Sequence, residues 1–444
     1  MNVQKEVVRP ELKRVLRLWD SIAIIVGIVV GAGIFRTPSD VARELGSNFE
    51  VLFLWIVGGI IATCGSLTFA ELASTWPRTG GMYVYLRECY GPLTSFLYGW
   101  TQLLVVRPSV VAGISVVFAE YVAYFIPLPQ GGVKLMAVSA ILAVSIINYI
   151  GVRTSSLVQK IFTSIKIAGI FLLALLGLFF HHSGHPILIE PSAFNLPSIS
   201  AVGAALILIF WTYDGWSEIT MVAGEIQEPQ KTIPKALLFG SLGVLFLYIL
   251  VNGAYLNVLG IEGVASSSRV ATDTMIELFG AKGGNIIAGI VLISTFSTLN
   301  GIALTGPRIF FAMAVEGDFF SWARKIDPKY RTPSTAIALQ AFFAIPLVAL
   351  WKFEQLATYF VFAAQIFYVL CALSVFHLRQ KKIQEGEVYR AWGYPFTPML
   401  FVLVSFGIFV HALITSTPQV MVGFTIMFFG IPIYYLRQKI YFPK

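Results

Sequence analysis

The stretch Val26–Pro38 constrains the fold most, because glycine interrupts it in the middle of an apolar run. Residues 22–30 are apolar, and Gly31, Ala32 and Gly33 follow where a membrane helix would near its centre. Backbone that leaves the helix inside a bilayer is tolerated only where protein buries it or it lines a cavity. Free N–H groups at the start of a new helix suit a carboxylate. A helix-packing groove explains the same glycines, and this stretch alone favours neither interpretation.

Composition indicates a membrane protein. Of the 444 residues, 57% are hydrophobic and only 12% are charged, about half the charged fraction of a soluble domain. Apolar runs of about 20 residues, the length that crosses a bilayer, recur from end to end. The charged, amphipathic start predicts no cleavable signal peptide. The three cysteines form no spaced pair, so we expect neither a disulfide framework nor a metal site.

We predict an all-α polytopic membrane protein with twelve transmembrane helices. Their approximate ranges are 18–45, 50–75, 92–126, 133–151, 156–181, 198–226, 233–258, 283–312, 334–351, 355–378, 396–415 and 419–437. An even number of spans places both termini on one side of the membrane.

The distribution of basic residues predicts which side that is. Of the 31 Lys and Arg residues, 23 fall on the side of the termini. Five fall on the other side, namely Arg43, Lys134, Arg269, Lys282 and Lys352, and three lie inside spans, namely Arg36, Arg107 and Lys166. The positive-inside rule then predicts that both termini are cytoplasmic. Topology accounts for the net charge of +8, so we expect no nucleic-acid partner.

A second apolar span is also interrupted at its centre. In 198–226, apolar residues lead to Thr212-Tyr213-Asp214-Gly215-Trp216, and Ser217-Glu218 opens a new turn. An acidic residue in mid-membrane is costly and usually functional. The two interrupted spans are five apart, and such matching breaks indicate a midplane substrate site in an inverted-repeat transporter. The second break therefore favours the transporter interpretation over a packing groove.

Five ordered stretches resemble one transporter superfamily. They are GAGIF at 31–35, ELASTWPRTGGMYVYLRECYG at 71–91, YDGW at 213–216, GEIQEPQKTIPKAL at 224–237 and STLNGIALTGPRIFFAMAVEGDFF at 297–320. Together they are similar to the amino acid–polyamine–organocation superfamily, and within it to the L-amino-acid transporter family. GAGIF alone is weak evidence, but the ordered set, whose flanks cover most of residues 15–380, is specific.

The resemblance implies a leucine-transporter-type 5+5 inverted repeat with discontinuous helices 1 and 6. The expected segments are a cytoplasmic segment 1–17, a first repeat 18–181, a second repeat 198–378, accessory helices 396–437 and a cytoplasmic tail 438–444. It also implies alternating access and an amino-acid substrate, usually exchanged one for one without sodium. We expect no cofactor.

The resemblance also carries over substrate-binding residues. The substrate carboxylate is expected at the N–H groups of Ala32 and Gly33, beside Gly31, and its ammonium at the carbonyls of Val29, Trp211 and Asp214. Helix-end electrostatics agree with this assignment. Trp211 corresponds to an aromatic gate, although simple core packing explains it too. Tyr213 and Tyr248 complete the predicted site, with Asn252 and Tyr255 as alternatives to Tyr248.

Lys166 is the only lysine deep in a span. The resemblance implies that its ammonium takes the place of a sodium ion, with backbone near Gly27 and the hydroxyl of Ser294 or Ser297 as partners. A purely structural tie to carbonyls is the alternative. A buried lysine can also release its proton, so proton coupling stays open.

Two arginines are candidates for side-chain selectivity. Arg107-Pro108 interrupts 92–126, where proline frees a carbonyl, and Arg107 either recognises an acidic substrate or, as we favour, pairs with Asp214 or Glu120. Arg36 stands where the family more often has an apolar residue. Metal binding at His181, His182 and His185 is less favoured than a solvated loop, so no metal site is predicted.

Two cytoplasmic stretches, Trp76–Gly91 and Glu316–Thr332, predict short interfacial helices. The loop after 92–126 lacks the cysteine that links relatives to a glycoprotein heavy subunit, so we expect no disulfide-linked partner. The prediction is an inner- or plasma-membrane, sodium-independent exchanger of neutral L-amino acids such as alanine or serine. A proton-coupled symporter using Lys166 is the first alternative. A channel and a membrane enzyme are more remote, since no pore-lining charge pattern or nucleophile–base pair is found.

Overall fold

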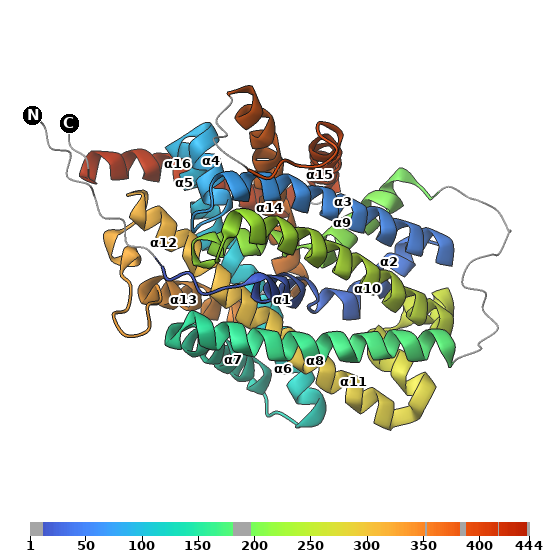
Figure 1. Cartoon of the computed structure of the whole chain (residues 1–444). Coiled ribbons are helices and arrows are strands. Elements are labelled where there is room, and N and C mark those ends of the chain that lie inside the picture. The colour runs from blue at the N-terminus through green and yellow to red at the C-terminus, as the bar shows by residue number, and fades with distance from the viewer. Residues whose placement is uncertain (1–11, 181–196, 351–352, 382–387, 416, 442–444) are drawn as a thin grey trace, which may run out of the picture.

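The computed structural model describes residues 12–180, 197–350, 353–381, 388–415 and 417–441 (Figure 1). Within these ranges all regular structure is helical, apart from one isolated bridge between Leu16 and Ile226. The prediction of an all-α chain is confirmed. His181, His182 and His185, and the tail 442–444, lie outside the described residues.

In the described part of the chain, sixteen α-helices and three irregular helical segments follow one another. They are α1 (Leu18–Val29), α2 (Gly33–Glu44), α3 (Asn48–Thr75), α4 (Met82–Tyr90), α5 (Pro92–Thr101), the π-helix η1 (Gln102–Val106), α6 (Arg107–Phe125), α7 (Gly132–Ile150), α8 (Val152–Phe179), α9 (Ile199–Tyr213), the 3₁₀ segment η2 (Trp216–Glu225), α10 (Pro229–Ser266), α11 (Val270–Thr305), α12 (Pro307–Val315), the 3₁₀ turn η3 (Ser321–Arg324), α13 (Ser334–Leu350), α14 (Phe353–Gln380), α15 (Phe396–Thr415) and α16 (Thr417–Tyr441).

Eight helices of the described chain are long and apolar enough to cross a membrane, or nine if α1 and α2 form one broken span. These eight helices, together with the pair α1 and α2, coincide with nine of the predicted spans. The other three predicted spans correspond to α13, α14 and α16, of which α13 is shorter and the other two lie partly outside the described side chains. The count of twelve stays a prediction.

Two predicted span limits coincide with glycine kinks. Non-helical backbone at Gly260 in α10 (φ +67°) and Gly280 in α11 (φ +64°) stands close to the predicted ends at 258 and 283. Positive φ favours glycine because it has no Cβ, so the chain turns there. The predicted interfacial stretches contain α4 and η3.

The predicted interruption of 92–126 at Arg107-Pro108 is wrong. α5, η1 and α6 run on as one 34-residue helical span, Pro92–Phe125. The five-residue π-helix η1 directly precedes Arg107. A π-turn widens the helix locally, so the helix continues past the proline although the proline has no N–H to donate. Such turns are frequent at functional sites.

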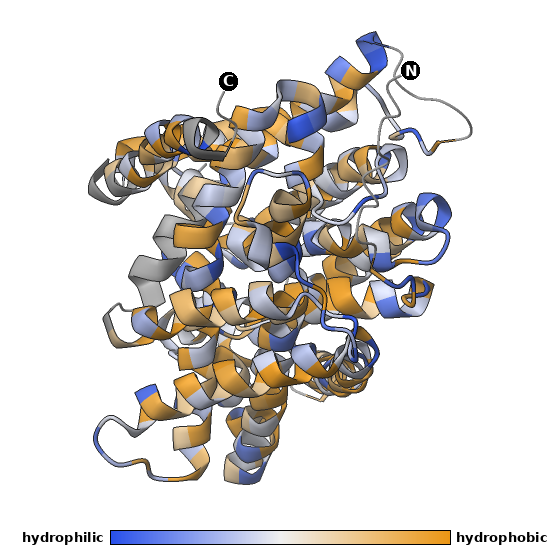
Figure 2. Cartoon of the chain, turned by 90° about the vertical axis from the view of Figure 1, so that its left-hand side faces the viewer, coloured by the Kyte–Doolittle hydropathy of each residue, from blue (hydrophilic) through white to orange (hydrophobic). Residues whose placement is uncertain are grey.

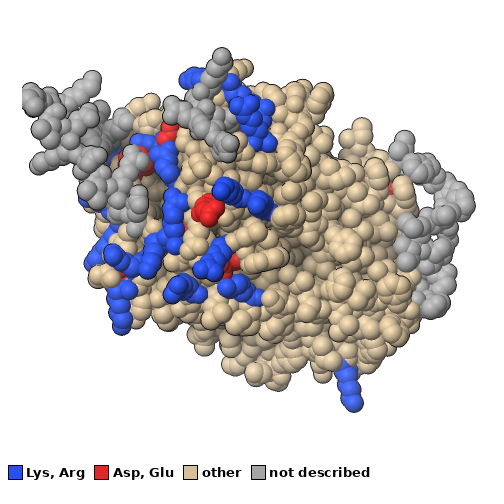
Figure 3. Space-filling view, viewed as in Figure 1, with Lys and Arg blue, Asp and Glu red and all other residues tan. Residues whose placement is uncertain are grey.

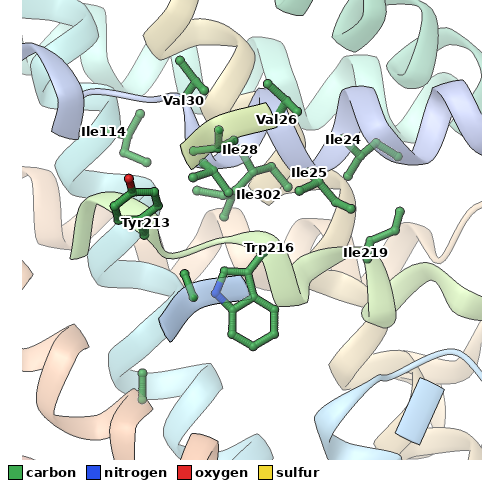
Figure 4. Packing of buried hydrophobic residues seen from close by; sticks show 14 of the residues in the cluster. Ile24, Ile25, Val26, Ile28, Val30, Ile114, Tyr213, Trp216, Ile219 and Ile302 are labelled. Carbon is green, nitrogen blue, oxygen red and sulfur yellow. The ribbon is translucent and has the colours of Figure 1, made fainter. Parts of the chain in front are cut away.

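Apolar side chains cover the outer helix faces as well as the interior. On α10, Phe239, Leu242 and Phe246 are exposed at helical spacing, which suits contact with lipid rather than water. Figure 2 shows hydrophobic residues along most of the helices, with hydrophilic stretches in loops and at helix ends. Inside, α1 packs its isoleucines and valines against other core side chains such as Tyr213, Trp216 and Ile302 (Figure 4).

The two ends of the molecule differ in charge. In Figure 3, Lys and Arg gather over the end that carries α4, α12 and α16, and tan surface covers most of the remainder of that view. The polar ends and the apolar flanks together support a multi-pass membrane protein.

Candidate functional site

The candidate site lies where two helical spans break in contact with each other. α1 and α2 meet at a bend of 43°, and Asp214 and Gly215 separate α9 from η2. Gly215 has φ +112°, and a Cβ there would lie 2.7 Å from the Ile28 side chain of α1. Only glycine combines this backbone angle with so close an approach. Both predicted breaks are confirmed.

The backbone at the start of α2 has free donors. In the described part of the chain, no carbonyl accepts a hydrogen bond from the N–H of Ala32 or Gly33. A Cβ on Gly31 or Gly33 would lie 2.9 Å from Thr298 or Thr212, respectively. Any larger residue at these two positions would therefore collide with Thr298 or Thr212. Unpaired N–H groups at a helix N-terminus suit an anion.

A cavity connects the two breaks with α6 and α11. It contains seven predicted site residues together with residues that sequence reasoning did not select. The lining is Ile28, Val29, Gly31, Ala32, Gly33, Val106, Arg107, Val110, Ile114, Trp211, Thr212, Asp214, Gly215, Glu218, Thr298 and Ile302. Free N–H groups and apolar side chains in one cavity suit a small zwitterion with a short side chain.

Lys166 lies directly behind the first break. Its ammonium, fully buried, donates to the carbonyls of Gly27 and Val30, each at 2.6 Å. The carbonyl of Ser294 at 3.4 Å and the hydroxyl of Thr298 at 3.5 Å complete its surroundings. Lys166 thus connects α8 to the broken α1 and to α11. The contact predicted with backbone near Gly27 is confirmed.

The predicted hydroxyl partners of Lys166 need correction. Ser294 offers its backbone carbonyl, while its hydroxyl donates to the Val30 carbonyl at 3.0 Å. The Ser297 hydroxyl faces Thr163 of α8 at 3.4 Å. Thr298, one residue further along α11, faces the lysine because each helical residue rotates the side chain by about 100°.

Tyr248 of α10 joins the two breaks. Its buried hydroxyl lies 2.8 Å from the Val29 carbonyl and 3.1 Å from the Thr212 carbonyl. Tyr248 therefore holds the walls of the cavity without lining it. The Val29 carbonyl, predicted to receive the substrate ammonium, already has this partner, and the Trp211 carbonyl accepts from the Asp214 N–H at 3.3 Å. The Val29 carbonyl also accepts from the Gly31 N–H at 2.8 Å, so both of its lone pairs are engaged, whereas the Trp211 carbonyl retains one acceptor site.

The three aromatic and acidic residues of the second break point in different directions. Trp211 is half-buried and lines the cavity. Tyr213 points away from it, because its hydroxyl donates to the Trp55 carbonyl of α3 at 3.1 Å. The carboxylate of Asp214 accepts from the Tyr368 hydroxyl of α14 at 2.6 Å.

The partner of Arg107 is Glu218, not Asp214 or Glu120. The guanidinium donates to both carboxylate oxygens of Glu218, at 2.7 and 2.8 Å, and to the Gln102 side chain at 3.0 Å. Thr305 of α11 also donates to Glu218. The favoured structural pairing of Arg107 is therefore present with a different carboxylate. Because both charges line the cavity, the pair also forms a polar wall of the site.

Sequence reasoning missed three residues of this arrangement. Glu218 stands four residues after Asp214, and an unpaired arginine in a neighbouring span signalled that a buried acid must exist. Thr298 and Tyr368 carried no such signal, because hydroxyl-bearing residues are common in membrane helices. Arg36 lies outside this cavity and lines a neighbouring one that also includes Ala32.

A cavity between two broken helices, with a buried ion pair in its wall, is the architecture of a membrane transporter. The sequence profile of the family described as Amino acid permease matches residues 16–436, so the chain belongs to the amino acid permease family. This membership confirms the resemblance to the amino acid–polyamine–organocation superfamily and excludes the alternative of an enzyme.

Relatives cover nearly the whole chain. It is 33% identical to the serine/threonine exchanger SteT of Bacillus subtilis, over 96% of this chain and 98% of the relative. It is 32% identical to human b(0,+)-type amino acid transporter 1 over 89% of this chain and 81% of that protein. Identity to human large neutral amino acids transporter small subunit 2 is 30%, over 96% and 80%. These relatives support the predicted amino-acid antiporter.

Proposed function

We propose that the chain is a sodium-independent, obligatory exchanger of neutral L-amino acids of the size of alanine, serine or threonine. The observation that carries the proposal is Lys166, whose ammonium already occupies the carbonyl oxygens of Gly27 and Val30. Carbonyl and hydroxyl oxygens are the ligands that a sodium ion would need at this place. A fixed cation there replaces the coupling ion.

The cavity supports a small neutral substrate. The N–H groups of Ala32 and Gly33 receive its carboxylate, and the carbonyls of Trp211 and Asp214 receive its ammonium. Apolar residues such as Val110 and Ile114 face the side chain, beside Arg107 and Glu218, which neutralise each other. The relative named as a serine/threonine exchanger agrees with such a substrate.

We further propose a plasma-membrane location with both termini in the cytoplasm and no disulfide-linked partner. The gathering of Lys and Arg at one end supports this orientation (Figure 3). Cys64, Cys89 and Cys371 are free thiols, and each belongs to a helix rather than to the loop after α6.

Uptake into proteoliposomes tests the proposal. Labelled alanine, serine, leucine, glutamate and arginine are supplied in sodium-free buffer without a pH gradient, with and without unlabelled amino acid inside. We expect serine and alanine to enter only when the lumen contains amino acid. Entry that needs an imposed proton gradient would instead support the symporter alternative.

A further inference from the structure

A basic loop lies against the corner between two membrane-crossing helices. Only Gly151 separates α7 from α8, and both helices are long and apolar enough to cross a membrane (Figure 1). Residues 317–332, which we call the basic loop, pack on this corner. In the last turn of α7, the ring of Tyr149 lies 5.2 Å from that of Tyr330, and its carbonyl accepts from the Thr332 hydroxyl at 2.9 Å. The basic loop therefore stands where these two spans leave the membrane.

Both acidic residues of the basic loop are already engaged. The Asp327 carboxylate accepts from the Tyr149 hydroxyl at 2.9 Å and from two N–H groups of its own loop at 2.8 and 2.9 Å. Asp318 pairs with Arg87 of α4. Within the described structure, neither acid forms an ion pair with a basic residue of the loop itself. The Asp327 contacts instead fix the loop on α7.

The basic side chains of the loop are exposed to solvent. They are Arg324, Lys325, Lys329 and Arg331. Among the described residues these four form no ion pair, although Lys329 lies over the Tyr330 ring at 4.9 Å. Arg308, by contrast, pairs with the Glu225 carboxylate. The loop thus carries a cluster of positive charge without an internal counterion, which suits an anionic partner.

Apolar surface continues from the basic loop along both helices. Phe320 and Trp322 are 45% and 47% exposed, and their rings stack at 5.8 Å. Exposed aromatic rings beside cations are typical of the membrane–water interface. Exposed apolar residues recur every fourth position on each helix, namely Leu142, Ile146 and Ile150 on α7 and Leu157, Ile161 and Ile165 on α8. Residues at this spacing share one helix face, so each helix offers an apolar stripe that starts near the corner.

We propose that the basic loop and the corner of α7 and α8 bind an anionic phospholipid. Its phosphate lies at the four loop cations, and its acyl chains follow the apolar stripes of the two helices. Clusters of about four or more Lys and Arg residues beside a span attract anionic lipids electrostatically. Because Asp327 and Tyr149 already fix the loop, binding orders little additional chain. This inference concerns the lipid and holds whatever substrate the protein carries.

The double variant Lys329→Gln/Arg331→Asn tests the site. Arg331 has φ +56°, and asparagine tolerates this left-handed backbone, so the loop is retained. Purified protein receives equal amounts of phosphatidylglycerol and phosphatidylcholine, and native mass spectrometry counts the lipids that it retains. We expect the wild type to prefer phosphatidylglycerol and the double variant to lose about tenfold of that preference, since each cation near the surface contributes to the attraction.

Lys231→Gln/Lys235→Gln is the matched control. It removes the same charge from two exposed positions in the first turns of α10 and should retain the wild-type preference. Inorganic phosphate alone should not displace the lipid, because the apolar stripes hold its chains. Equal retention of the two lipids by the wild type, an equal loss in both double variants, or displacement by phosphate would overturn the lipid site. None of these measurements involves transport, so their failure leaves the proposed exchange untouched.

Discussion

Single residues determine the ion chemistry of the site, and Lys166 is foremost among them. Its ammonium has only backbone and hydroxyl oxygens around it in the described structure, contributed by α1 and α11. A charged donor to a buried carbonyl is worth more than a neutral one. Lys166 therefore both neutralises this group of oxygens and holds the broken α1 in place.

Replacing Lys166→Gln should slow exchange at least about tenfold, because buried carbonyls that lose a charged donor cost about 1–3 kcal/mol. The initial rate of L-serine counterflow in proteoliposomes measures the effect. Arg153→Gln is the control, because Arg153 is exposed in the first turn of the same helix. A wild-type rate in Lys166→Gln would contradict the role given to the lysine.

Tyr248→Phe isolates the hydroxyl that joins the two breaks. The ring keeps its packing against Trp55, but the carbonyls of Val29 and Thr212 lose the hydroxyl proton that they share. We expect a half-saturating serine concentration several-fold higher and a stability loss of about 1 kcal/mol. Tyr213→Phe is matched, because it removes a hydroxyl that binds Trp55 outside the cavity. Equal half-saturation in the two variants would show that Tyr248 does not hold the site.

The residue contacts show where prediction from sequence ended. Lys166 was predictable, because a lone lysine in an apolar span must find oxygens. Glu218 is 111 residues from Arg107, and no local pattern names the partner of a buried charge across that distance. The choice between Ser297 and Thr298 depended on the rotation of α11 about its axis, which helical spacing alone does not determine.

At the scale of elements, the paired breaks organise the site. Interruptions were predictable because glycine or aspartate stands in mid-span, and the kinks at Gly260 and Gly280 follow from the same conformational freedom. The continuous path through Pro108 was not predictable, because a π-turn depends on how neighbouring helices support the backbone.

Gly215→Ala tests whether the second break must be this tight. A Cβ at φ +112° would lie 2.7 Å from Ile28, so we expect loss of exchange and a melting temperature lower by several degrees. Gly243→Ala in α10 is the control, because no atom lies within 4 Å of its Cβ position. That change should leave exchange intact and stabilise the helix by about 0.5–1 kcal/mol. Normal exchange by Gly215→Ala would mean that the contact is not needed.

At the scale of the whole molecule, buried ion pairs close the basic end. Arg308 and Glu225 are almost fully buried and lie 2.8 Å apart. The Glu225 carbonyl also accepts from the N–H groups of Val15 and Leu16, so the chain before α1 is fastened to the end of η2. These contacts hold the basic end closed in this structure.

Arg308→Gln should destabilise the protein by about 3–5 kcal/mol, because it leaves the Glu225 carboxylate buried without its partner. Thermal unfolding in detergent followed by size-exclusion chromatography measures the loss. Lys231→Gln removes a charge from the exposed pair with Glu228, and such pairs contribute at most about 1 kcal/mol. Equal melting temperatures for the two variants would refute the closing role of the buried pair.

Counterflow of L-serine tests the central claim most directly. Proteoliposomes containing unlabelled serine, and matched empty ones, receive labelled serine in sodium-free buffer; the empty ones are also given inward sodium and proton gradients. The fixed cation of Lys166 predicts rapid uptake into serine-filled liposomes and none into empty ones under either gradient. Uptake into empty liposomes driven by sodium or by protons would contradict exchange without a coupling ion.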